Sequence, residues 1–254
     1  MDLSGDLSLL TLLVLTAVAF AAGFISAIAG GGGIITLPAL LWAGVSPLDA
    51  LGTNKFQSVF GTASSALNYF QKGHLDFRPL GSALVAAVCG SALGTWTVTR
   101  LGGEQLQTLL PLLLIAIAVY FACSPRISDL DSQPRMSNGS FNLLVGSGVG
   151  FYGGFFGPGM GSMSALAFSA LLGYNMRRAT AHTKPLVLAT NITSMVIFMA
   201  GGHLLPWLAV SMSAAQFLGA RLGSNLVIAR GAVLIKPVLI LATIAAAIKL
   251  LLES

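Results

Sequence analysis

The amino-acid sequence predicts an all-α fold, a polytopic membrane helix bundle with two inverted repeats. Each repeat is expected to contain a short helix pair broken by glycine, followed by three crossing helices. Composition predicts the membrane, because 55% of the 254 residues are hydrophobic and 8% are charged, against roughly 25% charged in an ordinary soluble domain. The repeats are predicted by a match between the two halves of the chain.

Ten helical segments are predicted from apolar runs, many of about 20 residues, which is the length that crosses the hydrocarbon core of a bilayer. Their approximate bounds are 7–29, 34–44, 48–71, 79–100, 104–123, 140–156, 162–173, 178–200, 206–229 and 235–252. The first run, Leu7 to Ile28, follows Asp2 and Asp6 rather than a basic stretch and ends in glycines. We therefore expect a retained membrane helix there, not a signal peptide.

The longest polar stretch, Ser124 to Ser140, divides the chain nearly in half. Its Pro, Ser, Asp and Gly residues are typical of a solvent-exposed connection. We predict repeat 1 over residues 1–123, a cytoplasmic linker over 124–139 and repeat 2 over 140–254, with five helical segments in each repeat.

Residues of the first half match residues of the second half at one constant sequence separation. After a two-residue shift, the match continues at a second constant separation. The matched pairs are Gly23 and Gly150, Gly30 and Gly157, Gly32 and Gly159, Lys55 and Lys184, Gly90 and Gly219, Gly94 and Gly223, and the Gly-His-Leu tripeptides at 73–75 and 202–204. Chance rarely keeps so many glycines and a lysine in register, so the halves are interpreted as copies of one unit.

Charge placement predicts that the copies are inverted, because cytoplasmic loops collect Lys and Arg. The connection 72–78 holds Lys72 and Arg78, whereas its counterpart 201–206 holds no Lys or Arg. The connections assigned to the cytoplasm are 72–78, 124–139, 174–178 and 230–236. Both termini then lie outside, segments 1 and 2 enter and leave on the outer side, and segments 6 and 7 do so on the inner side. Whether the short second member of each pair crosses or re-enters is left open.

Glycine-rich breaks separate the two members of each short pair. They consist of Gly30, Gly31, Gly32 and Gly33 in one copy, and of Gly157, Pro158, Gly159, Met160 and Gly161 in the other. A helix cannot continue through such runs cheaply, since each Gly costs about 1 kcal/mol and each Pro about 3 kcal/mol. Unwound backbone at membrane depth must line a cavity or be buried in protein. Each break also precedes a helix N-terminus, which attracts anions.

Two such helix ends, brought together by a pseudo-twofold axis, would form an anion site. The alternative is that the glycines serve only close helix packing. That explanation suits the four glycines at four-residue spacing, which are Gly90, Gly94, Gly219 and Gly223. It suits the breaks less well, because contiguous glycines do not form one helix face.

The third helix of each copy is too polar to face lipid. The candidate substrate-binding residues are Thr53, Asn54, Lys55, Ser58 and Thr62 on segment 3, and His182, Thr183, Lys184 and Asn191 on segment 8. Residues on each helix recur at spacings of three or four, which predicts one polar face, and such faces usually line a substrate path. The alternative for Lys55 and Lys184 is snorkelling to the lipid headgroups.

Histidine contributes one further candidate. His182 precedes the Thr183-Lys184 pair, whereas His74 and His203 occupy the matching Gly-His-Leu turns. A single His beside a membrane helix is more often a hydrogen-bonded loop or interface residue than a proton relay. Only His182 is therefore kept among the site residues.

Three stretches resemble the sulfite exporter TauE/SafE family of membrane transporters: GFISAIAGGGGIITLPALLWAGVSPLDALGTNK, GFYGGFFGPGMGSMSALAF and ATAHTKPLVLATN. The resemblance covers nearly the whole chain. It implies transport of sulfite, sulfonates or related organosulfur anions, usually without ATP, by a multi-pass protein of the cell (inner) membrane. The second copy has Ala181-His182-Thr183 where the first has Gly52-Thr53-Asn54, so the two halves of the site are expected to differ.

Competing functional classes are less well supported. All Asp and Glu residues lie in termini or connections, which removes an intramembrane aspartyl dyad, and no nucleophile stands opposite an in-membrane His. No Walker-type motif is present. A passive anion channel stays open as the alternative to alternating access.

The expected partners are a small anionic substrate and the lipid bilayer. The scattered Lys and Arg residues, with a net charge of +5, form no basic block, so no nucleic acid is expected. No cofactor, catalytic residue or metal site is predicted. A coupling proton or counter-ion and a homodimer are compatible with the sequence.

Overall fold

The computed structural model describes residues 8–122 and 131–230, and over these ranges the protein is all-α. The elements are α1 (Leu9–Ala29), α2 (Gly33–Trp42), α3 (Pro47–Gln71), the short 3-10 helix η1 (Arg78–Leu80), α4 (Gly81–Thr99), α5 (Gly103–Ala122), α6 (Asn138–Phe155), α7 (Met160–Leu172), α8 (Met176–Ala200) and α9 (Pro206–Arg230). The all-α helix bundle predicted from the sequence is confirmed.

Nine of the ten predicted segments correspond to these helices, with bounds that differ by at most two residues. Local chemistry explains this agreement. Ser46 caps α3 by accepting a hydrogen bond from the Asp49 N–H at 3.3 Å, and Asn175 caps α8 by accepting from the Arg178 N–H at 2.9 Å, as Ser and Asn commonly do. The tenth segment, 235–252, lies outside the described residues, as do the termini and residues 124–130 of the linker.

Three helices are long and apolar enough to cross a membrane: Leu9–Ala29, Met176–Ala200, and α4 counted with η1, Arg78–Thr99. Two further helices, α3 and α9, are also 25 residues long, but more of their residues are polar. Among the described helices, α2 is the shortest α-helix, with 10 residues. At 1.5 Å per residue it spans about 15 Å, about half of the hydrocarbon core.

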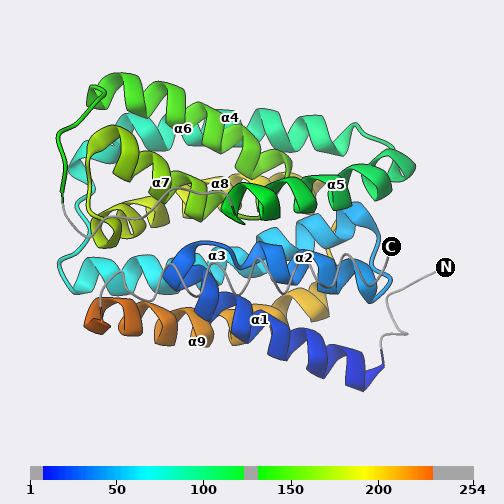
Figure 1. Ribbon diagram of the computed structural model, residues 1–254. Coiled ribbons are helices and arrows are strands. Elements are labelled where there is room, and N and C mark those ends of the chain that lie inside the picture. The colour runs from blue at the N-terminus through cyan, green and yellow to red at the C-terminus, as the bar shows by residue number, and fades with distance from the viewer. Residues whose placement is uncertain (1–7, 123–130, 231–254) are drawn as a thin grey trace.

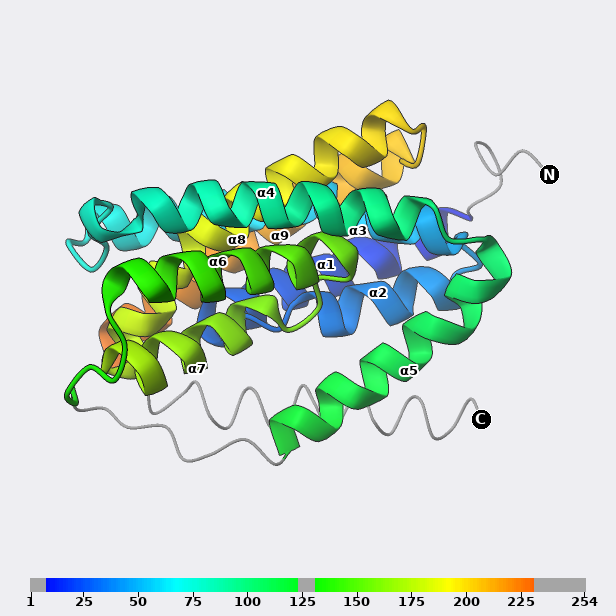
Figure 2. The same cartoon turned by 90° about the horizontal axis from the view of Figure 1, so that it is seen from above.

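Helices α3 and α8 form the centre of the bundle. They pack against each other, with the α4–α6 pair on one side and the α1–α9 pair on the other (Figures 1 and 2). Because α3 contacts α9, α8, α1 and α2, its polar residues are surrounded by protein on several sides. This arrangement allows a polar helix to lie within a membrane protein.

Glycines allow the outer pairs to approach closely. A Cβ atom added at Gly90 or Gly94 of α4 would overlap the backbone of α6 around Phe151. A Cβ atom at Gly219 or Gly223 of α9 would likewise overlap the α1 backbone. The prediction that these four glycines serve close helix packing is confirmed, in agreement with the use of small residues at membrane helix interfaces.

The packing role of these glycines can be tested on Gly94. We expect Gly94→Ala to lower the free energy of unfolding by about 1–3 kcal/mol, the usual cost of overpacking, because the new methyl group meets the Phe151 carbonyl. Gly148→Ala, on α6, is the matched control, since a Cβ atom there meets nothing within 4 Å. The measurement is thermal unfolding in detergent. Equal stability of the two variants would contradict the assigned packing.

The glycine contacts are reciprocal between the two halves. Gly94 meets Phe151, and its counterpart Gly223 meets Phe24, which matches Phe151 in the register that pairs Gly23 with Gly150. In the same way, Gly90 meets Ser147, and its counterpart Gly219 meets Phe20. Two inverted repeats would produce this pattern, and the repeat itself stays a prediction.

Each short helix pair turns back inside the bundle. The α6–α7 pair begins and ends at one end, because the Ser132 N–H donates to the Gly173 carbonyl at 2.7 Å and the Arg135 N–H donates to the Leu171 carbonyl at 2.8 Å. The α1–α2 pair begins and ends at the opposite end, where Leu15, Leu37 and Leu208 share one apolar cluster. Figure 1 shows these two pairs entering from opposite ends.

The connections between the helices lie at the two ends of the bundle. At one end, the Asn142 amide donates to the Pro79 carbonyl at 2.9 Å, and partial burial, followed by the nearby charge of Arg177, lowers the pKa of His74. At the other end, the Leu205 N–H donates to the Thr53 hydroxyl at 3.3 Å. The turns 72–78 and 174–178, both assigned to the cytoplasm, therefore lie together and opposite the turn 201–206.

The orientation in the membrane remains a prediction with a direct test. In a chain whose Cys89 and Cys123 are replaced by Ser, we expect Ser137→Cys to react with a membrane-impermeant maleimide only after the cells are opened. We expect Gly202→Cys to react in intact cells. The reason is the Lys and Arg bias of the connections. Labelling of both cysteines from the same side would contradict the topology.

Candidate functional site

The two glycine breaks meet at the centre of the molecule. Gly30 lies against Gly161, so closely that a Cβ atom on Gly30 would lie 2.5 Å from the Gly161 carbonyl carbon. The Ser162 hydroxyl donates to the Ala29 carbonyl across this contact. Gly33 lies beside Pro158 of the other break. The close approach of the two breaks, which the sequence predicts only through pseudo-symmetry, is a feature of the structure.

The breaks bring the N-termini of α2 and α7 into the bundle. Gly30, Gly157 and Gly159 have φ values of 79°, 100° and 79°, a region in which glycine avoids the steric cost of a side chain. Gly32 and Gly159 are the N-cap residues of α2 and α7. The Ile34 and Ile35 N–H groups of α2 and the Met160 N–H group of α7 each donate to a carbonyl of their own break at 3.0 Å, so only the other N–H groups of these first turns are available to a ligand.

Lys55 lies on α3 beside the second break. Its side chain is 1% exposed, and its ammonium group donates to the Gly153 carbonyl of α6. A Cβ atom on Gly157 would overlap the Lys55 Nζ atom, so the ammonium group touches the break directly.

Lys184 occupies the equivalent position on α8. Its side chain is 3% exposed, and Nζ donates to the Ser26 carbonyl of α1 at 2.8 Å. Ser26 and Gly153 are counterparts in the register that pairs Gly23 with Gly150. Each lysine therefore donates to a backbone carbonyl at the matching position of the other half.

The burial of the lysines rules out the snorkelling alternative, since neither ammonium group reaches the surface. Neither lysine pairs with a carboxylate within 8–122 and 131–230, where the one ion pair joins His203 to Asp49 at 3.5 Å. Buried charges in proteins are normally paired, so a bound anion would supply the partner that these two buried lysines lack.

Asn54 belongs to a buried amide cluster next to the first break. Its Oδ1 atom accepts hydrogen bonds from the Thr36 hydroxyl at 2.6 Å and from the Gln57 Nε2 at 3.2 Å. A Cβ atom on Gly33 would lie 3.5 Å from the Asn54 Nδ2. The cluster is therefore continuous with the break and, through Pro158 and Gly157, with Lys55.

Other predicted site residues lie away from this crossing or contact it less directly. Thr53 is buried, but its hydroxyl accepts the Leu205 N–H at the 201–206 turn. Thr62 and Asn191 are each 6% exposed on α3 and α8. Ser58 is only half-buried, whereas Gln57 is fully buried. The polar face predicted through Ser58 stays a prediction, and Gln57 lies outside the predicted set.

His182 and Thr183 lie on the N-terminal half of α8. The His182 Nδ1 donates to the Arg178 carbonyl at 2.8 Å, and its ring packs against Tyr174 with the ring centroids 5.2 Å apart. The His182 Nε2 is buried without a hydrogen-bond partner. The Thr183 hydroxyl donates to the Thr180 carbonyl at 2.8 Å. No group of three or more His, Cys, Asp or Glu side chains in the described ranges could hold a metal ion.

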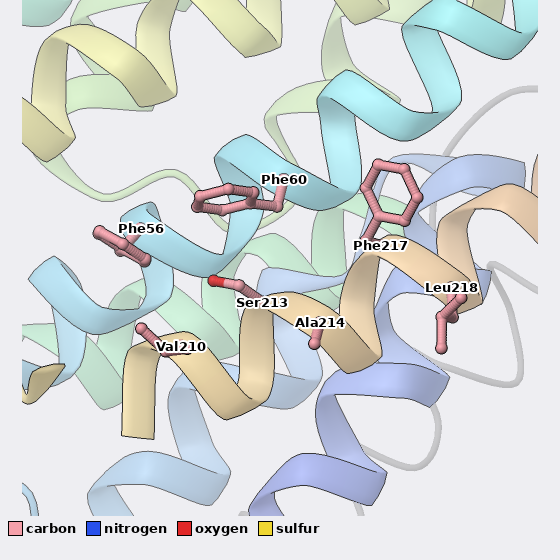
Figure 3. Close-up of a pocket in the computed structure, with 7 residues that line it drawn as sticks. All are labelled: Phe56, Phe60, Val210, Ser213, Ala214, Phe217 and Leu218. Carbon is pink, nitrogen blue, oxygen red and sulfur yellow. The ribbon is translucent and has the colours of Figure 1, made fainter. Parts of the chain in front are cut away.

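A pocket of about 450 Å³ between α3 and α9 is unsuited to an anion (Figure 3). Its lining residues are Phe56, Phe60, Val210, Ser213, Ala214, Phe217 and Leu218. Several of them, including Phe60 and Leu218, are exposed on the surface of the bundle. This pocket faces outward and is apolar, as expected of a surface covered by lipid.

Two polar residues next to the site, Gln57 and Thr36, were not identified from the sequence. Gln57 follows Asn54 by three residues, a spacing that places both on one helix side, so that pattern could have identified it. Thr36 lies inside an apolar run, and only the folded contact with Asn54 reveals it.

Known proteins resemble this chain over nearly its whole length. The family model "Sulfite exporter TauE/SafE" matches residues 15–250. A probable membrane transporter from Sinorhizobium sp is 43% identical over 97% of this chain and 94% of the relative. A probable membrane transporter from Haemophilus influenzae is 42% identical over 95% of this chain and 93% of the relative.

The probable membrane transporter YfcA from Escherichia coli K12 is 41% identical over 95% of this chain and 90% of the relative. No solved structure matches the chain. The buried lysines and glycine breaks thus occur in a membrane helix bundle whose relatives are named as transporters. The chain belongs to the sulfite exporter TauE/SafE family of membrane transporters.

Proposed function

We propose that this protein transports small sulfur-containing anions, such as sulfite or a sulfonate, by an ATP-independent, alternating-access mechanism. It would act as a multi-pass protein of the inner cell membrane. The family name supports the sulfur-containing substrate. The site supports an anion of small size, because the breaks, the helix ends and the lysines converge within direct contact of one another.

One observation carries the proposal: two buried ammonium groups lie at the crossed breaks without an acidic partner among the described residues. A small anion in low-dielectric surroundings needs compensating positive charge. Each helix end supplies about half a charge, so two helix ends and a lysine match a monovalent or divalent anion.

The two lysines are suited to successive steps of transport. Lys55 lies close to Asn54 and the outer turn, whereas Lys184 lies one helical turn beyond Thr180 on the inner half of α8. We infer that the anion contacts Lys55 when the site opens outward and Lys184 when it opens inward. The backbone of Gly30 lies against that of Gly161, and we propose that the anion passes only when the two breaks shift relative to each other.

This geometry favours alternating access over a passive channel, because the backbones of the two breaks touch. Inverted pairs of broken helices at the membrane midplane are a recurrent device of secondary transporters. A channel would instead need a continuous polar path.

The test is uptake into proteoliposomes containing purified protein. The anions are sulfite, thiosulfate, sulfate and a sulfonate, each measured with and without a pH gradient, and protein-free liposomes are the control. We expect saturable uptake of at least one reduced-sulfur or organosulfur anion in preference to sulfate. Equal uptake of all four anions, or none above the control, would contradict the proposal.

A further inference from the structure

The cluster beside Lys55 contains an acceptor that has no donor. The Gln57 side chain is 0% exposed, and its Oε1 atom has no hydrogen-bond partner. Burying a carbonyl oxygen without a donor is costly. Since Gln57 hydrogen-bonds to Asn54, which lies against Gly33 of the first break, this unused acceptor belongs to the surroundings of the proposed anion site.

The contacts of Asn54 fix which groups stay available. A carbonyl oxygen has two lone pairs, and the Asn54 Oδ1 uses both, for the Thr36 hydroxyl and the Gln57 Nε2. The Asn54 Nδ2 therefore points to the break as a donor. The Gln57 Nε2 donates one of its two N–H groups to Asn54, and the Gln57 Oε1 stays without a donor.

The Lys55 side of the site thus combines several donors with one acceptor. The donors are the Lys55 ammonium group, the Asn54 Nδ2 and the first N–H group of α2, that of Gly33. They suit the negatively charged oxygens of an anion. The Gln57 Oε1 suits the opposite chemistry, an O–H or N–H group, which a fully deprotonated and unsubstituted oxyanion lacks.

We propose that the Gln57 Oε1 accepts a hydrogen bond from the transported anion, so that the site selects anions carrying an O–H or N–H group beside the charged group. A protonated oxyanion such as hydrogensulfite and a hydroxyl- or amino-substituted sulfonate share this chemistry. The inference rests on the proposed function and narrows its substrate class.

The second half of the chain has no equivalent acceptor. In the register that pairs Lys55 with Lys184, the counterpart of Gln57 is Leu186 on α8, which is fully buried. The amide acceptor at this position is therefore present on the Lys55 side alone. The asymmetry gives the bound anion a preferred orientation, with its donor group toward Gln57.

The experiment compares two anions that differ by one hydroxyl group, ethanesulfonate and 2-hydroxyethanesulfonate. Their dissociation constants are measured by titration calorimetry on the purified full-length protein. We expect the wild type to bind the hydroxylated anion at least about tenfold more tightly, since a site built to hydrogen-bond a hydroxyl discriminates strongly against the analogue without it. We expect Gln57→Met to bring the ratio close to one.

Gln216→Met is the matched control. Gln216 is also a buried glutamine whose Oε1 has no partner, but it packs against Gly23 and Gly61. Its replacement should leave the ratio unchanged. If the wild type binds the two anions with a ratio of dissociation constants near one, the inference is overturned without any variant. A tenfold ratio that persists in Gln57→Met, or that is lost in Gln216→Met, would also overturn it.

Lys55→Met separates this inference from the proposed function. If Lys55→Met weakens the binding of both anions while Gln57→Met leaves their ratio intact, the anion site stands and the role of Gln57 fails. If the wild type binds neither anion, this inference fails, and the uptake of sulfite decides the proposed function separately. If Lys55→Met binds both anions normally, the lysine site of the proposed function fails and this inference fails with it.

Discussion

Replacing Lys55 or Lys184 with methionine should weaken the binding of sulfite by about tenfold to a hundredfold, the range expected for one hydrogen bond to a charged group. Methionine retains most of the side-chain volume but removes the ammonium group. Both lysines are buried where the breaks cross, and neither has a carboxylate partner in the described parts of the chain. The measurement is sulfite affinity of the purified variants by titration calorimetry.

Lys72→Met is the control for the lysine variants, because Lys72 is exposed at the C-cap of α3. Each test variant also removes one hydrogen bond to a backbone carbonyl, at Gly153 or at Ser26, so thermal unfolding must be measured alongside. Unchanged sulfite affinity in both folded variants would remove the lysines from the site and leave the glycine breaks and the amide cluster as its only components.

Replacing Gly31 with leucine should reduce transport to the level of protein-free liposomes while the protein still folds. A Cβ atom on Gly31 meets only the Ile34 side chain, at 3.3 Å, so the backbone of the break can stay in place. The rest of the leucine side chain would occupy space beside the N-terminus of α2, where an anion is expected to approach the N–H groups. The measurement is sulfite uptake at equal amounts of inserted protein.

Gly31→Leu is a cleaner test than Gly159→Leu, because Gly159 has a φ of 79° and any side chain there adds backbone strain. Gly102→Leu, in the exposed turn between α4 and α5, is the control, since a Cβ atom there meets nothing within 4 Å. Full transport by Gly31→Leu would show that the break serves packing alone.

The fold could be predicted closely because it depends on local and periodic features. Apolar runs indicate the helices, and capping residues such as Ser46 and Asn175 fix their starts. Glycine runs end α1 and α6, and glycine spacing identifies the helix faces that pack closely. Each of these signals lies within a few residues of sequence, or repeats at a fixed spacing, so no tertiary information is needed.

The site could be predicted only in part, because its contacts join segments far apart in the chain. The matched positions of the lysines and breaks identify them, but the Lys55 contact with Gly153 spans 98 residues. Thr36 gives no signal, since a threonine in an apolar run is ordinary. The spacing of three or four residues selects Ser58 rather than Gln57. It does not show which neighbours surround each face of α3.

Alternating access is tested most directly by counterflow in proteoliposomes that contain the wild-type protein. Vesicles are loaded with unlabelled sulfite, and the entry of labelled sulfite is followed over a range of outside concentrations. Alternating access through the crossed breaks predicts saturable entry that is faster into loaded than into empty vesicles. Entry that rises linearly with concentration, is indifferent to the internal sulfite and is accompanied by single-channel currents would contradict it.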